Sequence, residues 1–76
     1  MRKRRLEVSV TFDERRGYIA TAPELRTTVV ALSLGGLRGR IEAALLPEHV
    51  EVKLVLDALA KRERDRRRQQ TTQMAR

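Results

Sequence analysis

A strand, a charged turn and a second strand follow one another over residues 6–22, and no other segment constrains the fold as strongly. The apolar residues of the first strand occupy every second position, the period of a strand with one buried face: Leu6, Val8, Val10 and Phe12. The turn ends at Gly17, which can adopt the positive φ that closes a hairpin. The second strand, residues 18–22, ends before Pro23 because proline has no amide hydrogen for a ladder. The segment therefore predicts an antiparallel hairpin, with Leu25 folded back as an apolar plug.

Residues 26–56 predict a third strand, a helix and a fourth strand, in that order. Residues 27–32 are rich in β-branched side chains, which favours a strand. Ser33 can cap a helix, and apolar residues then recur at helical spacing, which predicts a face packed on the sheet: Leu34, Leu37, Ile41, Ala44 and Leu45. The glycines within this helix each cost about 1 kcal/mol relative to alanine. Residues 50–56 alternate again and predict a strand that returns to the same sheet.

The last segment predicts a basic helix that ends in disorder. Asp57 is placed to cap the helix, and Leu59 is its main apolar residue. Beyond Lys61 we expect the helix to be solvated. Pairs of opposite charge four residues apart support it: Asp57 with Lys61 and Glu63 with Arg67. We expect helix to about Arg68 and disorder over residues 69–76.

The charge of the chain is unevenly divided. The net charge is +7 over 76 residues. Residues 6–60 carry six positive and eight negative side chains, a net of −2, whereas residues 1–5 carry four positive charges and residues 61–76 a net of +5. A slightly acidic body therefore lies between two basic ends. Such ends can attract a polyanion, and the same charge can serve only to keep a small protein in solution.

Composition excludes several classes of site. The chain has no cysteine, which rules out disulfides, thiolate metal sites and cysteine nucleophiles and gives no sign of an oxidising compartment. No stretch approaches the roughly 20 apolar residues of a membrane span. A chain of 76 residues forms one domain, and its small core favours oligomerisation. We therefore expect a cytoplasmic protein with no membrane contact.

No constellation of residues predicts catalysis, a metal or a cofactor. His49 is the only histidine, and it stands in a turn without a second ligand at metal spacing, so a solvated histidine accounts for it. Gly35, Gly36 and Gly39 match neither the dinucleotide-binding nor the P-loop spacing. Tyr18 is expected to pair with a phenylalanine across the hairpin, as part of the core. We predict a protein that is not an enzyme and holds no cofactor.

The best candidate for contact with a polyanion is the basic segment of residues 61–68, in which six of the eight residues are Lys or Arg. Neutralised phosphates would give an affinity that falls steeply with salt. The chain has one Phe and one Tyr, both in the hairpin, so base stacking is not expected. A solvated charged helix explains the segment equally well. The candidate contact residues are Arg62, Arg64, Arg66, Arg67 and Arg68.

Three short motifs follow one another in order: Gly17-Tyr18-Ile19-Ala20, then Ala22-Pro23-Glu24-Leu25, then Ser33-Leu34 with Leu37, Ile41, Ala44 and Leu45. Through these motifs, residues 6–56 resemble the HicB antitoxin domain. The resemblance implies a small β-β-β-α-β unit of partly RNase H-like fold that inhibits a small basic ribonuclease of the HicA type. Many such proteins also bind operator DNA through an added C-terminal domain, for which the residues after Asp57 are too few.

Together these patterns predict an α+β domain over residues 6–60, a HicB-like β-β-β-α-β antiparallel sheet with one helix packed on it. A basic arm over residues 1–5 precedes it, and a basic, helical to disordered tail over residues 61–76 follows. The expected core consists of Val8, Val10, Phe12, Ile19, Leu25, Leu37, Ile41, Leu45, Val52 and Leu54.

The leading hypothesis is an antitoxin-like protein-binding module that neutralises a small basic HicA-like toxin, with a homodimer as the expected oligomer. The acidic body suits a basic partner, because opposite charge steers association. The alternative is a small nucleic-acid-binding accessory protein that contacts DNA or RNA through the basic C-terminal helix. A third possibility is a domain that serves only as an oligomeric scaffold.

Overall fold

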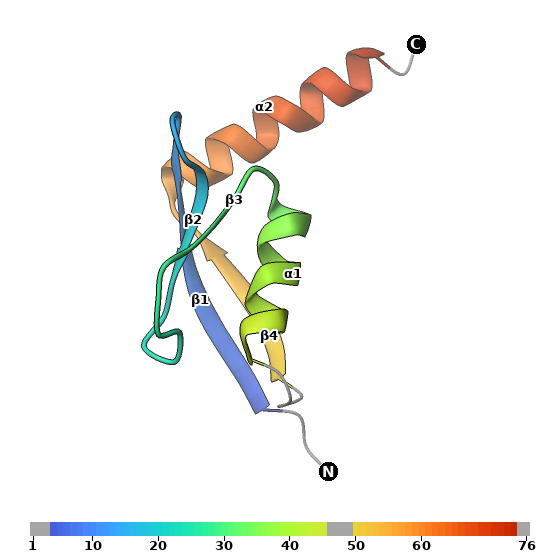
Figure 1. Ribbon diagram of the computed structural model, residues 1–76. Helices are drawn as coiled ribbons and strands as arrows, with labels where there is room; N and C mark the ends of the chain where they lie inside the picture. The colour runs from blue at the N-terminus through green and yellow to red at the C-terminus, as the bar shows by residue number, and fades with distance from the viewer. Residues whose placement is uncertain (1–3, 46–49, 75–76) are drawn as a thin grey trace.

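The structure is a computed structural model that describes residues 4–45 and 50–74 (Figure 1). The elements are β1 (Arg4–Asp13), β2 (Gly17–Thr21), β3 (Val29–Ala31), α1 (Leu34–Leu45), β4 (Val50–Leu56) and α2 (Ala58–Met74). The predicted α+β class and the β-β-β-α-β order are confirmed. Arg4 and Arg5, expected in a basic arm, belong to β1. His49 and the predicted helix break at Pro47 lie outside the described residues.

The strands form one mixed sheet in the order β3-β2-β1-β4. The pairs β1–β2 and β2–β3 are antiparallel, whereas β4 runs parallel to β1 with Leu6 opposite Val52. The prediction of an antiparallel sheet is therefore wrong for the fourth strand. The helix α1 carries the chain back along the sheet, and β4 then starts at the end where β1 starts, which makes the pair parallel.

The predicted hairpin is confirmed, with Phe12 opposite Tyr18 and Asp13 opposite Gly17. Gly17 has a φ of +95°, and a Cβ atom there would lie 2.6 Å from the carbonyl oxygen of Ala31, so both the turn and the neighbouring strand require glycine. Asp13 closes the turn by accepting a hydrogen bond from the amide of Arg15 (2.8 Å). The third strand is shorter than predicted and covers only Val29–Ala31.

The core lies between the inner face of the sheet and α1. Its buried apolar residues are Leu6, Val8, Val10, Tyr18, Ala20, Ala31, Leu37, Ile41, Val52 and Ala60. Five residues of the predicted core are among them, and Phe12, Leu25, Leu45 and Leu54 are half-buried and packed against it. Ile19 is the exception: because it pairs with Thr11, it points to the outer face, and its neighbours Tyr18 and Ala20 face the core instead.

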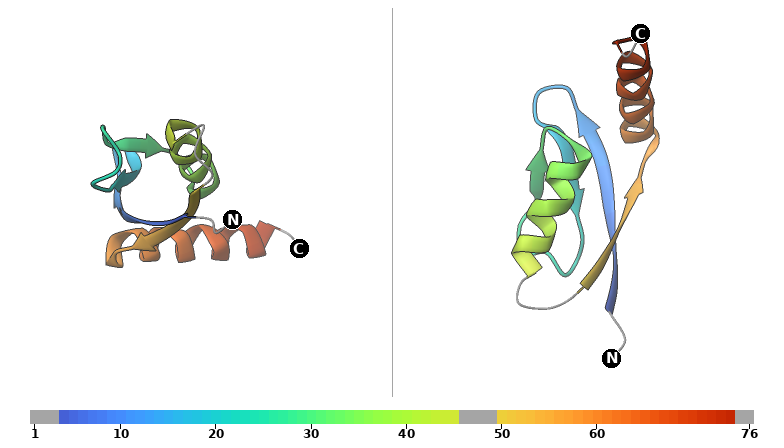
Figure 2. Two further views of the ribbon diagram at one scale, coloured as in Figure 1. Left: turned by 90° about the horizontal axis from the view of Figure 1, so that it is seen from below. Right: turned by 90° about the vertical axis from the view of Figure 1, so that its right-hand side faces the viewer.

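The helix α1 is capped as predicted, since the Oγ atom of Ser33 accepts a hydrogen bond from the amide of Gly36 (3.0 Å). Leu37 and Ile41 are fully buried against the sheet, which curls around the helix (Figure 2). From the solvent side of α1, Arg38 donates a hydrogen bond to the carbonyl oxygen of Val52 in the edge strand β4 (2.8 Å). This hydrogen bond gives a partner to a backbone carbonyl group of an edge strand.

The helix α2 crosses the end of the sheet where β1 and β4 finish, and both views in Figure 2 place β1 between α1 and α2. Its second half extends beyond the sheet (Figure 1). The backbone is helical to Met74, so the prediction of disorder after Arg68 is wrong for residues 69–74. Those residues include neither glycine nor proline, so nothing in them interrupts a helix once packing has fixed its first turns.

Candidate binding surface

The start of α2 is tied to the end of β1. The amide of Asp57 donates to the carbonyl oxygen of Val10 (2.9 Å), and the Oδ1 atom of Asp57 accepts from the amide of Ala60 (2.9 Å), which confirms the predicted cap. The hydroxyl of Thr11, and after it the amide of Ala60, hold the pKa of Asp57 below its usual value. This cap fixes which side of α2 faces the sheet.

That side carries Ala60 and Glu63, both buried, whereas the side chain expected to be buried, Leu59, is 54% exposed. The predicted solvation beyond Lys61 is therefore wrong for Glu63. Residues three and four apart share a helix face, so the cap at Asp57 that turns Ala60 inward turns Glu63 inward as well.

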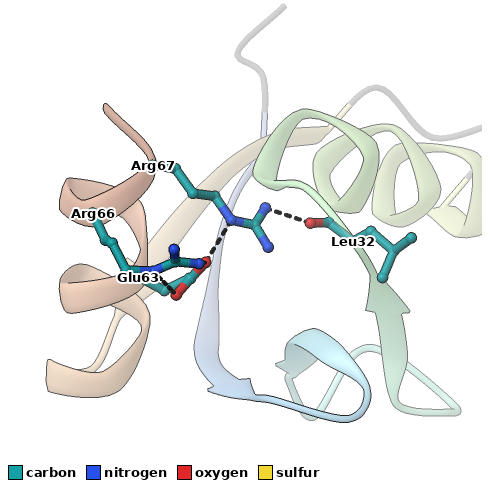
Figure 3. A network of polar contacts seen from close by, with 4 residues as sticks. All are labelled: Leu32, Glu63, Arg66 and Arg67. Carbon is teal, nitrogen blue, oxygen red and sulfur yellow. Dashed lines mark hydrogen bonds and ion pairs between the residues drawn. The ribbon is translucent and has the colours of Figure 1, made fainter. Parts of the chain in front are cut away.

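The buried carboxylate of Glu63 is held by two arginines of its own helix (Figure 3). Arg66 donates to it from Nε (2.9 Å) and Nη2 (2.5 Å), and Arg67 donates from Nε (2.7 Å). These hydrogen bonds, that of Arg66 first, lower the pKa of Glu63 to about 2. Glu63 also raises the pKa of Arg66 in return. The predicted pair of Glu63 with Arg67 is thus confirmed, and it forms part of a wider network.

Arg67 extends this network to two other parts of the fold. Its Nη1 atom donates to the carbonyl oxygen of Leu32, in the loop between β3 and α1 (2.5 Å; Figure 3). Its guanidinium lies 5.0 Å from the ring centre of Tyr18 and 5.8 Å from that of Phe12, and these rings pair edge to face at 5.2 Å. Burial raises the pKa of Tyr18, against the opposing effect of the nearby Arg67 charge. Arg67 therefore fastens α2 to the hairpin and to the loop between β3 and α1.

The five arginines predicted to contact a polyanion do not form one surface. Arg66 and Arg67 are engaged with Glu63, and Arg64 makes an exposed contact with Asp65 (3.1 Å). Arg62 and Arg66 line a hollow beside the β1–β2 turn. Arg68 is exposed. Arg67 thus contacts other elements of the fold, whereas Arg62, Arg66 and Arg68 are exposed on the helix.

An open apolar strip lies on the outer face of the sheet, the face opposite α1. We call it the outer strip; it consists of Ile19, Val30, Val55 and Leu59. Val55 is 45% exposed, and Ile19 pairs with Val30 across β2 and β3. Two neighbouring hollows lie along the strip, and Thr11 and Ile19 line both of them. Leu59 lines one hollow and Val55 lines the other.

The rim of the outer strip is charged. Acidic Asp13, Glu14 and Asp57 line the two hollows together with basic Arg15 and Arg62, while Glu63 and Arg66 neutralise one another there. The strip therefore combines an apolar floor, polar Thr11 between its members and a small excess of carboxylates. These are the features of a surface that can hold a protein segment.

Within residues 4–45 and 50–74, no group of three or more His, Cys, Asp or Glu side chains could hold a metal ion. In the same part of the chain, no helix has both the length and the apolar character that a membrane span requires. At the start of α1, the amide of Gly36 is bonded to the Ser33 side chain and is therefore not open to an anion.

These features define a small α+β protein whose mixed sheet is covered on one face and open on the other, with a basic helix across one end. No family model matches the chain, and neither the curated proteins nor the solved structures include a match.

Sequence reasoning missed Glu63 and the outer strip. The signal for the strip was present in the hairpin, because fixing Phe12 opposite Tyr18 places Ile19 on the face opposite the core. The signal for Glu63 was its spacing of three from Ala60 and of six from the capping Asp57.

Proposed function

We propose that this protein is an antitoxin-like binding module, which holds a small basic protein of the HicA ribonuclease type on the outer strip. The observation that carries the proposal is the open outer face, where Val55 is 45% exposed and Leu59 54% exposed beside half-buried Ile19. Large apolar side chains gathered on one face of a small protein are typical of a protein–protein contact.

Two further observations support the proposal. The element order from β1 to β4 is the β-β-β-α-β order that the resemblance to HicB domains implies. Carboxylates of Asp13, Glu14 and Asp57 line the hollows of the strip. A basic partner would approach such a rim favourably, because complementary charge speeds association.

The test is an affinity pull-down from the native host after nuclease treatment, read by mass spectrometry, with three forms of the protein. We expect the wild type to retain a small basic protein in near-equal amount. Val55→Glu, which places a charge in the strip, should retain at least tenfold less. The matched control Leu32→Glu adds the same charge at a side chain that is 77% exposed and lies off the strip, and it should retain the partner.

The captured protein is then purified and assayed as a ribonuclease. Inhibition by the wild type and by Leu32→Glu, but not by Val55→Glu, is the expected result. Equal inhibition by all three forms would contradict the outer strip as the site. Loss of all captured protein after nuclease treatment would contradict the antitoxin-like function itself.

A further inference from the structure

The carboxylate of Glu63 belongs to the wall of the hollow between the β1–β2 turn and α2, which we call the Glu63 hollow. Phe12, Ile19 and Leu59 give this hollow an apolar floor. Its volume is about 830 Å³, within the roughly 300 to 1,000 Å³ that ligand pockets occupy. The side chain of Glu63 is only 9% exposed, although it lines the hollow. A carboxylate in such surroundings binds a cation more strongly than one in water does.

Glu63 lies between two sides of α2, because residues three, four and seven apart share a side of a helix. Leu59 and Arg66 are on the side that lines the Glu63 hollow. Ala60 and Arg67 are on the side that packs on the fold. Glu63 is four residues after Leu59 and three after Ala60, so its carboxylate can be reached from both sides.

The two arginines that hold the carboxylate differ in their other contacts. Arg67 reaches toward the fold, where it bonds the carbonyl oxygen of Leu32 and lies over Tyr18 (Figure 3). Arg66 has a side chain that is 55% exposed, and it donates to the two carboxylate oxygens of Glu63 from Nε (2.9 Å) and Nη2 (2.5 Å). This two-bond geometry is the one in which a carboxylate receives any guanidinium group. Arg66 therefore fills a guanidinium site on the hollow side of the carboxylate.

The lining of the Glu63 hollow favours a cation with apolar neighbours. Apart from Arg66, its charged side chains are three carboxylates and two guanidinium groups: Asp13, Glu14, Glu63, Arg15 and Arg62. The excess of one negative charge favours a cation. Arginine matches the two oxygens of a carboxylate better than lysine does, because its guanidinium is planar and forked. The apolar floor suits apolar side chains beside that arginine, so the lining fits a short segment of a protein.

We propose that the Glu63 hollow is an arginine site, in which an arginine of a partner protein, flanked by apolar residues, replaces Arg66 on the carboxylate of Glu63. Arg66 then serves as a placeholder that keeps a buried charge paired when the partner is absent, since an unpaired buried charge is costly. The exchange of one guanidinium for another is nearly neutral at the carboxylate, whereas apolar contacts with Ile19 and Leu59 favour the partner. The inference deepens the proposed function and rests on it for the identity of the partner.

The arginine site is tested with peptides, without an identified partner. An NMR titration follows the amide signals of β1 and α2 while the blocked peptide acetyl-Leu-Arg-Leu-amide is added to the wild type. The control peptide has citrulline, which has nearly the shape of arginine but no charge, and we expect it to bind at least tenfold more weakly. Equal affinity of the two peptides would overturn the inference. So would equally tight binding of free arginine, because the apolar floor would then have no role.

Variants of the protein test the placeholder and the carboxylate. Arg66→Gln should bind the arginine peptide about threefold more tightly than the wild type, because a half-exposed ion pair no longer competes. The matched control Arg68→Gln removes the same charge from an exposed position of the same helix and should bind as the wild type does. No gain in Arg66→Gln, or an equal gain in both variants, would overturn the inference. Glu63→Gln should bind the arginine and citrulline peptides equally, and a retained preference for arginine would also overturn it.

Two further results separate this site from the proposed function. A preference of the wild type for the arginine peptide, with no basic protein captured in the pull-down, would support the arginine site and contradict the antitoxin-like function. Capture and inhibition of a basic ribonuclease, with no binding of the arginine peptide at millimolar concentration by the wild type or by Arg66→Gln, would support that function and overturn the arginine site. If amide hydrogen exchange shows that either variant loosens α2, the comparison of the two peptides on the wild type decides.

Discussion

The two helices of this protein are held to the same sheet by different physics. The helix α1 buries Leu37 and Ile41 completely against the inner face. Over residues 58–70, the part of α2 whose side chains the structure describes, one apolar side chain is buried, that of Ala60, and the helix is held by Glu63 and Arg67. Apolar burial depends on surface removed from water, whereas the contacts of α2 depend on charge.

This difference separates the responses of the two helices to solution conditions. Contacts between apolar side chains do not change with protonation, so α1 should stay packed wherever the domain is folded. The ion pairs of Glu63 are lost when its carboxylate is protonated, whereas salt screens this buried group much less than it screens exposed charges. The domain thus has a core that is insensitive to pH and a helix whose attachment is sensitive to it.

The largest expected effect is loss of the core under α1. Ile41→Ala removes a side chain with no exposed surface and should cost about 2 to 5 kcal/mol, a large part of the stability of a domain this small. Urea denaturation followed by circular dichroism measures the change. Glu42→Ala, at the exposed neighbour in the same helix, should stay within about 0.5 kcal/mol of the wild type. Wild-type stability of Ile41→Ala would refute the packing of α1 on the sheet.

A smaller effect, confined to α2, is expected from Glu63→Gln. Glutamine carries no charge, so Arg66 and Arg67 lose their ion pairs with residue 63, and amide hydrogen exchange should accelerate in α2 while the amides of β1 and β2 keep their protection. Arg62→Gln provides the comparison at an exposed position of the same helix. Equal acceleration of amide exchange in the sheet and in α2 would show that α2 does not open independently of the rest of the fold.

The pH dependence of the free energy of unfolding tests the same difference between the two helices. The pKa of Glu63 is about 2 in the folded protein, below its ordinary value of 4.5, so the unfolded chain takes up the proton first as pH falls. The contribution of Glu63 to the free energy of unfolding is therefore complete above pH 4.5 and is lost between pH 4.5 and about 2. The wild type and Glu63→Gln should differ most at neutral pH and converge near pH 2. If the difference in free energy of unfolding between the two proteins did not change with pH, the charge of Glu63 would have no role in stability.

The smallest effect is a gain within α1. A Cβ atom added at Gly39 meets nothing within 4 Å, so Gly39→Ala should stabilise the helix by about 0.5 to 1 kcal/mol. At Gly36 a Cβ atom would lie 3.1 Å from the capping Oγ atom of Ser33, so Gly36→Ala should gain less. Thermal melting compares the two. If Gly39→Ala lowered the melting temperature instead, helix propensity would not be what limits the stability of α1.

The sequence predicts an element correctly where its local pattern has only one structural interpretation. The alternation of β1, the glycine at position 17 and the cap at Ser33 predict their elements correctly. The direction of β4 could not be read in this way, because an alternating segment pairs equally well in either direction until the path of α1 is known.

Local sequence patterns predict the candidate surfaces less well than they predict the fold. The basic character of residues 61–68 is plain in the sequence, but their composition alone does not tell a structural arginine from a surface one. The distinction arises because Asp57 sets the phase of α2, and that phase turns Glu63 and Arg67 toward Leu32 and Tyr18.

The sequence by itself determined the order of the elements, the hairpin and the residues of α1 that pack on the sheet, because these depend on neighbours within a few positions. Only the tertiary structure decided that Ile19 lies on an open face, that β4 is parallel and that Glu63 is buried. Each of these depends on where distant segments meet, and a periodic pattern along one segment has no information about the position of another.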